Sequence, residues 1–160
     1  MSHSLRPATL ADVPVILDLI RGLAEYERML DQVQATEAGL RDTLFPGSGE
    51  TPIAHCVLAE IDGAAAGFAL YFFNYSTFLG KPGLYLEDLF VKPELRGRGI
   101  GKALLLHLAR LANEKGCGRM EWAVLDWNAP AIAFYEALGA VRLPEWQLCR
   151  LSGAALQRHG

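Results

Sequence analysis

The residues best suited to chemistry form the stretch RGRGIGK, residues 96–102, in which three glycines alternate with other residues. The stretch follows the apolar run YLEDLFVKP and precedes ALLLHLARLANEK, which has the apolar spacing of a helix. Glycines between a strand and a helix leave backbone N–H groups uncovered at the positive end of the helix dipole. A pyrophosphate can bind such a row of N–H groups, and Arg96, Arg98 or Lys102 can add positive charge. We therefore predict an anion site here.

Two common phosphate-binding motifs do not match this stretch. A Walker A loop would need glycine in place of Arg96 and serine or threonine in place of Ala103. The dinucleotide pattern G-x-G-x-x-G would need glycine in place of Lys102 or Leu104. The pattern that remains is Arg-x-x-Gly-x-Gly between a strand and a helix. An ordinary strand-to-helix turn with solvated cations is the alternative explanation.

Two adjacent carboxylates, Glu87 and Asp88, lie in the apolar run before the glycines. Neighbouring side chains of a strand point to opposite faces, so we expect the sheet to separate these two. Their apolar neighbours predict that at least one is partly enclosed, which would raise its pKa and suit it to accept a proton. Structural caps or ion-pair members would account equally well for two such residues.

Periodicity along the first half of the chain predicts the elements that position these residues. A capping-box pattern at Thr9 and Asp12 precedes a helix over residues 13–25, and Thr36 begins a shorter helix that ends at Pro46. Strands of alternating or apolar character follow, with the dipeptide Asp-Gly predicting a hairpin turn between the first two. We place the strands at residues 55–61, 64–75 and 84–91, the turn at Asp62-Gly63 and a loop at residues 78–83.

The segment after the glycines predicts alternating helices and strands. The helix that begins at the glycines ends at Gly116, and residues 119–127 form the next strand. Asn128 then caps a short helix, and residues 146–151 form a last strand.

The composition is that of one globular domain over residues 1–160. A net charge of −3 gives no reason to expect nucleic acid as a partner, and no apolar stretch is long enough to span a membrane. The three cysteines have neither metal-ligand spacing nor an even number, so we expect a reducing, cytoplasmic setting and no metal site.

The segments YLEDLFVKPELRGRGIGKALL and AVLDWNAPAIAFYEALGA resemble the GNAT superfamily of acetyl-coenzyme-A-dependent N-acetyltransferases. The first carries that family's Arg/Gln-x-x-Gly-x-Gly motif, and the second its Asn-x-x-Ala/Ser-x-x-x-Tyr motif. The likeness runs from about Leu5 to Trp146 and is strongest to the spermidine/spermine and thialysine acetyltransferase group. It implies a mixed α/β (α+β) fold, with a mostly antiparallel sheet and a parallel strand pair at the cofactor site. It also implies acetyl-coenzyme A as cofactor and a homodimer.

The resemblance implies roles for individual residues. The backbone at the end of the strand, the glycine stretch and the start of the later helix would bind the cofactor: Leu89, Phe90, Val91, Arg96, Gly97, Arg98, Gly99, Ile100, Gly101, Lys102, Asn128, Ala129, Pro130 and Ala131. Tyr135 would be the general acid and Glu87 the base, acting directly or through a water, although spacing alone favours a core aromatic at Tyr135. Spaced carboxylates and aromatic residues would bind a cationic amine: Tyr26, Glu27, Glu87, Glu121, Trp122, Ala123, Asp126 and Trp127.

Three functions remain open at this stage. The first is acetyl transfer to a small primary amine, a diamine or polyamine, by direct attack in a ternary complex, because no residue stands out as a covalent acyl carrier. The second is the same reaction on thialysine-like amino acids. The third is a non-catalytic acyl-coenzyme-A sensor, against which the presence of both Glu87 and Tyr135 argues.

Overall fold

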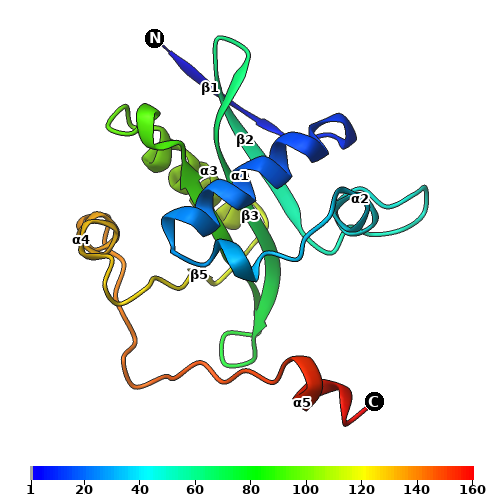
Figure 1. Cartoon of the computed structure of the whole chain (residues 1–160). Coiled ribbons are helices and arrows are strands. Elements are labelled where there is room, and N and C mark those ends of the chain that lie inside the picture. Colours follow the sequence, from blue (N-terminus) through cyan, green and yellow to red (C-terminus); the bar gives the residue numbers. More distant parts are fainter. Residues whose placement is uncertain (1) are drawn as a thin grey trace. The chain divides into compact units, whose positions relative to one another are not determined.

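Five strands form one sheet in the order β1-β2-β3-β4-β5 in the computed structural model, which describes residues 2–160 (Figure 1). The pairs β1–β2, β2–β3 and β3–β4 are antiparallel, and β4–β5 is parallel. The chain divides into two compact units, Met1–Ala123 and Val124–Gly160. The first unit contains β1 (His3–Pro7), α1 (Val13–Tyr26), α2 (Glu37–Leu44), β2 (His55–Ile61), β3 (Ala64–Ser76), β4 (Lys81–Val91), α3 (Ile100–Glu114) and β5 (Arg119–Glu121). The second contains α4 (Ala129–Ala137) and α5 (Gly153–Gln157). The expected mixed α/β class and the single parallel pair are confirmed.

Local sequence signals explain most of these boundaries. The backbone N–H of Thr9 donates to Asp12 at 2.7 Å ahead of α1, and that of Gly39 donates to the Thr36 hydroxyl at 3.0 Å at the start of α2. The turn between β2 and β3 has φ of 52° at Asp62 and 79° at Gly63. Two successive positive φ values suit the tight hairpin turn that the dipeptide predicts.

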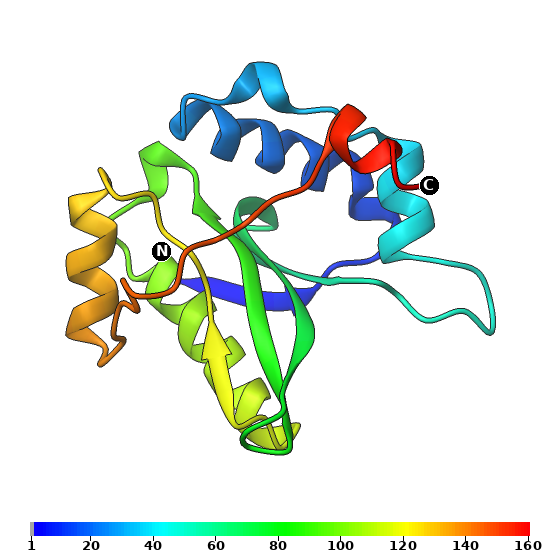
Figure 2. The same cartoon turned by 90° about the horizontal axis from the view of Figure 1, so that it is seen from below.

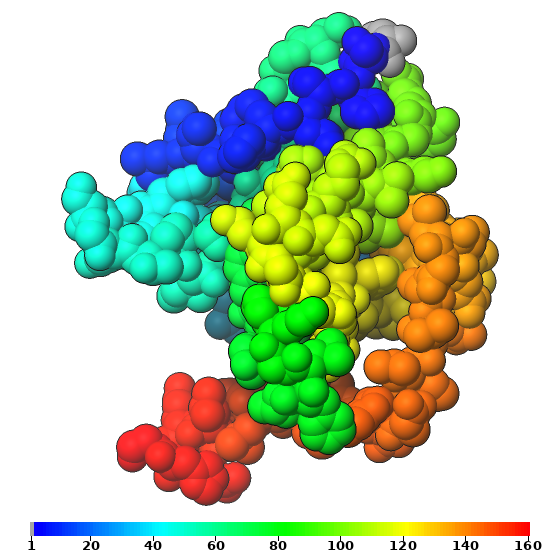
Figure 3. All heavy atoms as spheres, turned by 180° about the vertical axis from the view of Figure 1, so that it is seen from behind, coloured from blue at the N-terminus to red at the C-terminus, as the bar shows by residue number. Residues whose placement is uncertain are grey.

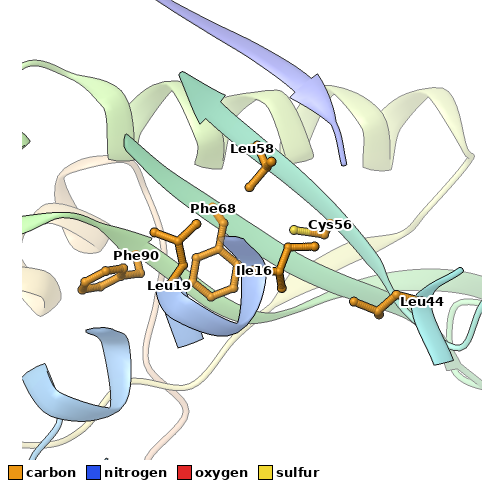
Figure 4. Packing of buried hydrophobic residues seen from close by; sticks show 7 residues of the cluster. All are labelled: Ile16, Leu19, Leu44, Cys56, Leu58, Phe68 and Phe90. Atoms are coloured by element: carbon orange, nitrogen blue, oxygen red, sulfur yellow. The ribbon is translucent and has the colours of Figure 1, made fainter. Parts of the chain in front are cut away.

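The sheet of the first unit is covered on both faces (Figure 2), with α1 and α2 on one side and α3 on the other. On the first side, side chains from both helices and from β2, β3 and β4 form one apolar cluster (Figure 4), comprising Ile16, Leu19, Leu44, Cys56, Leu58, Phe68 and Phe90. Phe68, at its centre, is fully buried. Burial of a side chain of this size is worth about 1.5–3 kcal/mol, so the cluster firmly fixes α1 against β3 and the end of β4.

On the opposite face, α3 lies over β4 and β3. Its residues Leu104 and Leu108 are fully buried, as are Leu84 and Leu86 of β4. Seen from this side (Figure 3), the atoms of α3 occupy the middle of the face, and the turn between β3 and β4 projects beyond them. Phe78, in that turn, is fully exposed.

Three expected boundaries are wrong. The strand expected at residues 119–127 ends at Glu121, because β5 pairs only with Gly83–Tyr85 of β4. Residues 146–151, expected as a last strand, are extended but pair with no strand in the part of the chain that the structure describes. A strand needs a partner for its backbone hydrogen bonds, which apolar alternation alone does not supply. The expected loop at 78–83 is shorter, since Lys81–Gly83 belong to β4.

One strand was missed. β1 pairs antiparallel with β2 over His3–Pro7, although the sequence HSLRP has no run of apolar alternation. Arg6 on this strand forms ion pairs with Asp12 at 2.8 Å and with Glu60 of β2 at 2.9 Å. Contacts between residues far apart in the sequence therefore stabilise β1, and local propensity does not reveal them.

Candidate active site

The glycine stretch forms the loop between β4 and α3. Gly97 has a φ of 80° and Gly99, the N-cap of α3, has a φ of 78°, values that residues with a Cβ rarely adopt. A Cβ built on either glycine would meet no protein atom within 4 Å. Glycine is therefore required by the backbone conformation, and the outer side of the loop is open space.

The helix that follows presents free donors to that space. The first backbone N–H to close a helical hydrogen bond is that of Ala103, which donates to the Gly99 carbonyl at 3.0 Å. The N–H groups of Ile100, Gly101 and Lys102 precede that bond and have no helical acceptor. Together with the exposed side chains of Arg98 and Lys102, they form a positive surface that fits a pyrophosphate.

Gly101 differs from the other two glycines. Its backbone is helical, and a Cβ would make only an ordinary contact with Val91 Cγ2, at 3.8 Å. The protein itself therefore gives no dihedral reason for glycine there.

Arg96, expected at the phosphate, makes contacts in another direction. Its Nε donates to the carbonyl oxygen of Val91 at 2.9 Å. Its guanidinium carbon lies 4.5 Å from the ring centroid of Tyr26 and 5.6 Å from that of Phe90. The side chain thus connects the end of β4 with the last residue of α1.

The strand β4 changes register at its carboxylates. Leu70 of β3 pairs with Asp88, but the next residue, Tyr71, pairs with Leu86, so Glu87 is an extra residue in β4. Such a bulge interrupts the alternation of side chains. The strict alternation behind the expectation that the sheet separates Glu87 from Asp88 is therefore interrupted. Glu87 acts electrostatically on Glu27, the C-cap of α1, and both glutamates act on Asp88.

Three carboxylates influence one another electrostatically around this bulge: Glu27, Glu87 and Asp88. Burial, followed by the charges of Glu87 and Glu27, raises the pKa of Asp88 to about 7. Burial and the charge of Glu87 also raise the pKa of Glu27. Because Glu87 itself is exposed, the enclosed carboxylate that the sequence predicted is Asp88. Asp88 was not among the predicted site residues, and only the register shift reveals its position.

The region where β4 and β5 separate carries further polar groups. Beyond Tyr85 the ladder between these strands stops, so the edge of β4 at Leu89–Val91 has no β5 partner. The pKa of Tyr85 is raised by burial and by the charges of Glu87 and Glu121. Glu121, expected to contact substrate, forms an ion pair with Arg119 at 3.1 Å. Trp122 and Ala123 follow directly after β5.

The second unit holds the remaining predicted residues. Asp126 and Trp127 precede α4, and the Asn128 side chain accepts from the N–H of Ala131 at 3.3 Å, which caps the helix as expected. Pro130 lies in the first turn, between Ala129 and Ala131.

Tyr135 lies in the last part of α4. Its ring centroid is 5.4 Å from that of Phe134, and its side chain is partly exposed.

Other candidate groups in the described chain carry no chemistry of this kind. Burial raises the pKa of the Cys56 thiol to about 12, which makes it a poor nucleophile. Residues 2–160 contain no cluster of three metal-ligating side chains. No helix in that range is long and apolar enough to cross a membrane. A hollow of about 270 Å³ between α1 and the end of β4, lined by Arg21, Phe90 and Lys92 among others, contains no carboxylate of the bulge.

Known proteins are similar to this chain over nearly its whole length. The chain is 45% identical to thialysine N-epsilon-acetyltransferase of Bos taurus over 96% of its own length and 94% of that protein. It is 37% identical to spermidine/spermine N(1)-acetyltransferase-like protein 1 of Homo sapiens, covering 92% of this chain but 22% of that longer protein. An integron cassette protein of V. cholerae has the same fold, with a TM-score of 0.78 and 26% identity, over 99% of this chain and 98% of that one. Residues 21–140 match the acetyltransferase (GNAT) family. The chain therefore belongs to the GNAT family and is an N-acetyltransferase.

Proposed function

We propose that residues 1–160 form a single domain that transfers an acetyl group from acetyl-coenzyme A to a small primary amine by direct attack in a ternary complex. The observation that carries this proposal is one strand–loop–helix segment with two functions. Its glycine loop offers backbone donors to an anion, and its bulge gathers carboxylates suited to a cation.

The residues of the first unit fit the cofactor. Backbone N–H groups at Gly97–Lys102 would bind the pyrophosphate, with Arg98 and Lys102 adding charge. The unpaired edge of β4 at Leu89–Val91 leaves backbone groups for an extended arm. From the second unit, Asn128–Ala131 at the start of α4 are proposed to contact the same cofactor. When bound, acetyl-coenzyme A would supply an acetyl thioester, which an amine can attack.

The carboxylates would bind the amine and take its proton. A free alkylammonium has a pKa near 10.4, so an acceptor is needed at neutral pH. We assign that role to Glu87, which is exposed at the bulge. Asp88, whose pKa of about 7 makes it partly ionised at neutral pH, is a second candidate base. Tyr26, Glu27, Glu121, Trp122, Ala123, Asp126 and Trp127 are the further residues proposed to surround the amine.

Tyr135 is the proposed general acid. A phenol of pKa about 10 retains its proton at neutral pH and can donate it from the hydroxyl oxygen to a departing thiolate. Its partly exposed position on α4 leaves the ring accessible.

The substrate class rests on the relatives. Both name acetylation of an amine at the end of a flexible aliphatic chain, on thialysine in one case and on a polyamine in the other. The higher identity and nearly full mutual coverage favour a thialysine-like amino acid, with diamines and polyamines second. A panel of thialysine, lysine, ornithine, putrescine and spermidine, measured by release of coenzyme A, tests this. Coenzyme A binding without turnover of any amine would instead support an acyl-coenzyme-A sensor.

We also propose a homodimer in the cytoplasm. Residues 141–151 contain no helix or strand and expose apolar side chains, among them Val141, Trp146 and Leu148, each at least 77% exposed. A second copy could cover them. The cysteines Cys56, Cys117 and Cys149 form no disulfide, which suits a reducing compartment. Light scattering that returns a monomer at micromolar concentration would contradict the dimer.

A further inference from the structure

We propose that Arg96, although part of the glycine motif, is a positioning residue for the amine site and not a ligand of the cofactor phosphates. This inference rests on the proposed function. It assigns an arginine of the cofactor-binding motif to the structural support of the amine site. It follows from the direction of the Arg96 side chain, the crowding between α1 and β4, and the charges that meet there.

The contacts of Arg96 all lie on the side of α1 and β4. One donor, Nε, bonds the Val91 carbonyl at 2.9 Å, and the guanidinium carbon lies 4.5 Å from the centroid of the Tyr26 ring. A guanidinium over an aromatic ring within about 6 Å is attracted by the negative face of the ring. The planar group therefore connects the last strand residue before the loop to the last residue of α1.

The end of α1 approaches β4 closely. At Gly22 a Cβ would lie 3.0 Å from the ring of Phe90, a contact tighter than most that Cβ atoms make, so the ring would have to shift by a few tenths of an ångström. One helical turn later, Tyr26 meets Arg96, and α1 ends there. Arg28 has a φ of 62°, and the N–H of Met29 donates to the Ala24 carbonyl at 2.8 Å, so the chain turns sharply after Glu27. This turn places Glu27 where it interacts with the bulge.

Electrostatic repulsion opposes that placement. Glu27 and Glu87 each act on Asp88 as like charges, so the end of α1 is repelled from β4. The attraction between Arg96 and the Tyr26 ring acts in the opposite sense. Arg96 would thus hold Glu27 close enough to Glu87 for both carboxylates to contact one amine.

The primary test separates the two subsites. Arg96→Gln should raise the amine KM at least about fivefold, change kcat less, and alter the coenzyme A dissociation constant in calorimetry less than threefold. Arg98→Gln, which removes the same charge two residues later, should do the reverse and weaken coenzyme A binding. Equal losses of coenzyme A affinity in the two variants would overturn the proposal.

Two further measurements identify the contact. Arg96→Lys keeps the charge but not the planar group, so it should resemble Arg96→Gln in amine KM; wild-type behaviour would contradict the stacking role. In thermal unfolding, Arg96→Gln and Tyr26→Leu each remove the same contact. The melting temperature of the double variant should therefore fall by less than the sum of the decreases in the two single variants. Additive shifts would argue against the pair. Because unfolding needs neither substrate nor activity, this arm remains decisive even if the proposed amine chemistry fails.

Discussion

The glycine loop and the carboxylate bulge lie on one continuous segment, β4 to α3, yet they obtain their properties in opposite ways. The loop depends on its own backbone: two left-handed glycines and the first N–H groups of α3 come from six consecutive residues, 97–102. The bulge depends on other elements, since Glu87 and Asp88 acquire their setting from the register of β3 and from Glu27 at the end of α1. A site built on backbone should thus fail through dihedral strain, and a site built on side chains through changes in charge.

The largest effect should come from removing one side-chain proton donor. Tyr135→Phe is expected to reduce kcat by about 10- to 10⁴-fold while leaving coenzyme A affinity intact, because it removes one oxygen and little volume. Steady-state kinetics and calorimetry on the same preparation check this. Phe134→Leu, which changes the neighbouring ring, is the control for packing. Activity of Tyr135→Phe within a factor of two of wild type would show that the acid lies elsewhere.

The backbone site should be sensitive to a β-branched residue at Gly99. Gly99→Val is expected to weaken coenzyme A binding at least about tenfold, because valine cannot readily adopt a φ of 78°. Calorimetry measures the affinity, and circular dichroism verifies the fold. Gly80→Val is a matched control, since Gly80 also has a positive φ and open space but lies in the turn between β3 and β4. If both variants bind coenzyme A as tightly as wild type does, the loop is not the anion site.

The two carboxylates should differ in their effect on the pH profile. Glu87→Gln is expected to lower the rate most near neutral pH, with partial recovery at high pH where the amine loses its proton unaided. We expect the rate of the wild type to fall on the acid side of its pH profile near pH 7, where Asp88 becomes protonated. Glu87→Gln should shift this fall to lower pH, because the charge of Glu87 helps to raise the pKa of Asp88. Asp88→Asn should remove this fall. A Glu87→Gln profile identical to wild type would exclude Glu87 as the proton acceptor.

The smallest effect concerns stability. The pKa of Asp88 is about 7 in the folded protein, above its ordinary 3.8, so the folded state binds this proton more tightly. The contribution of Asp88 to stability is therefore full below pH 4 and is lost as the pH rises through 7. Asp88→Asn should raise the free energy of unfolding at pH 8, by at most about 4 kcal/mol, and change it little at pH 3. Denaturant unfolding at both pH values measures this, and a loss of stability at pH 8 would contradict the burial of an unpaired charge.

The sequence predicted those parts of the fold that have a local cause. The Asp62-Gly63 hairpin, the cap at Thr36, the cap at Asn128 and the glycine start of α3 each follow from the conformational preferences of a few neighbouring residues. The strand at residues 146–151 was wrong and β1 was missed, because pairing between distant segments decides whether an extended stretch is a strand.

By itself, the sequence determined the family and the conformation of the glycine loop. Both depend on residue types at fixed spacing, and glycine conformations are set within the segment that contains them. Only the tertiary structure decided that Glu87 is an extra residue in β4, that Asp88 is the enclosed carboxylate, and that Arg96 contacts Tyr26. A bulge depends on how two strands align, burial depends on which helix covers the strand, and a long side chain has many rotamers. None of these is fixed until the distant segments have packed.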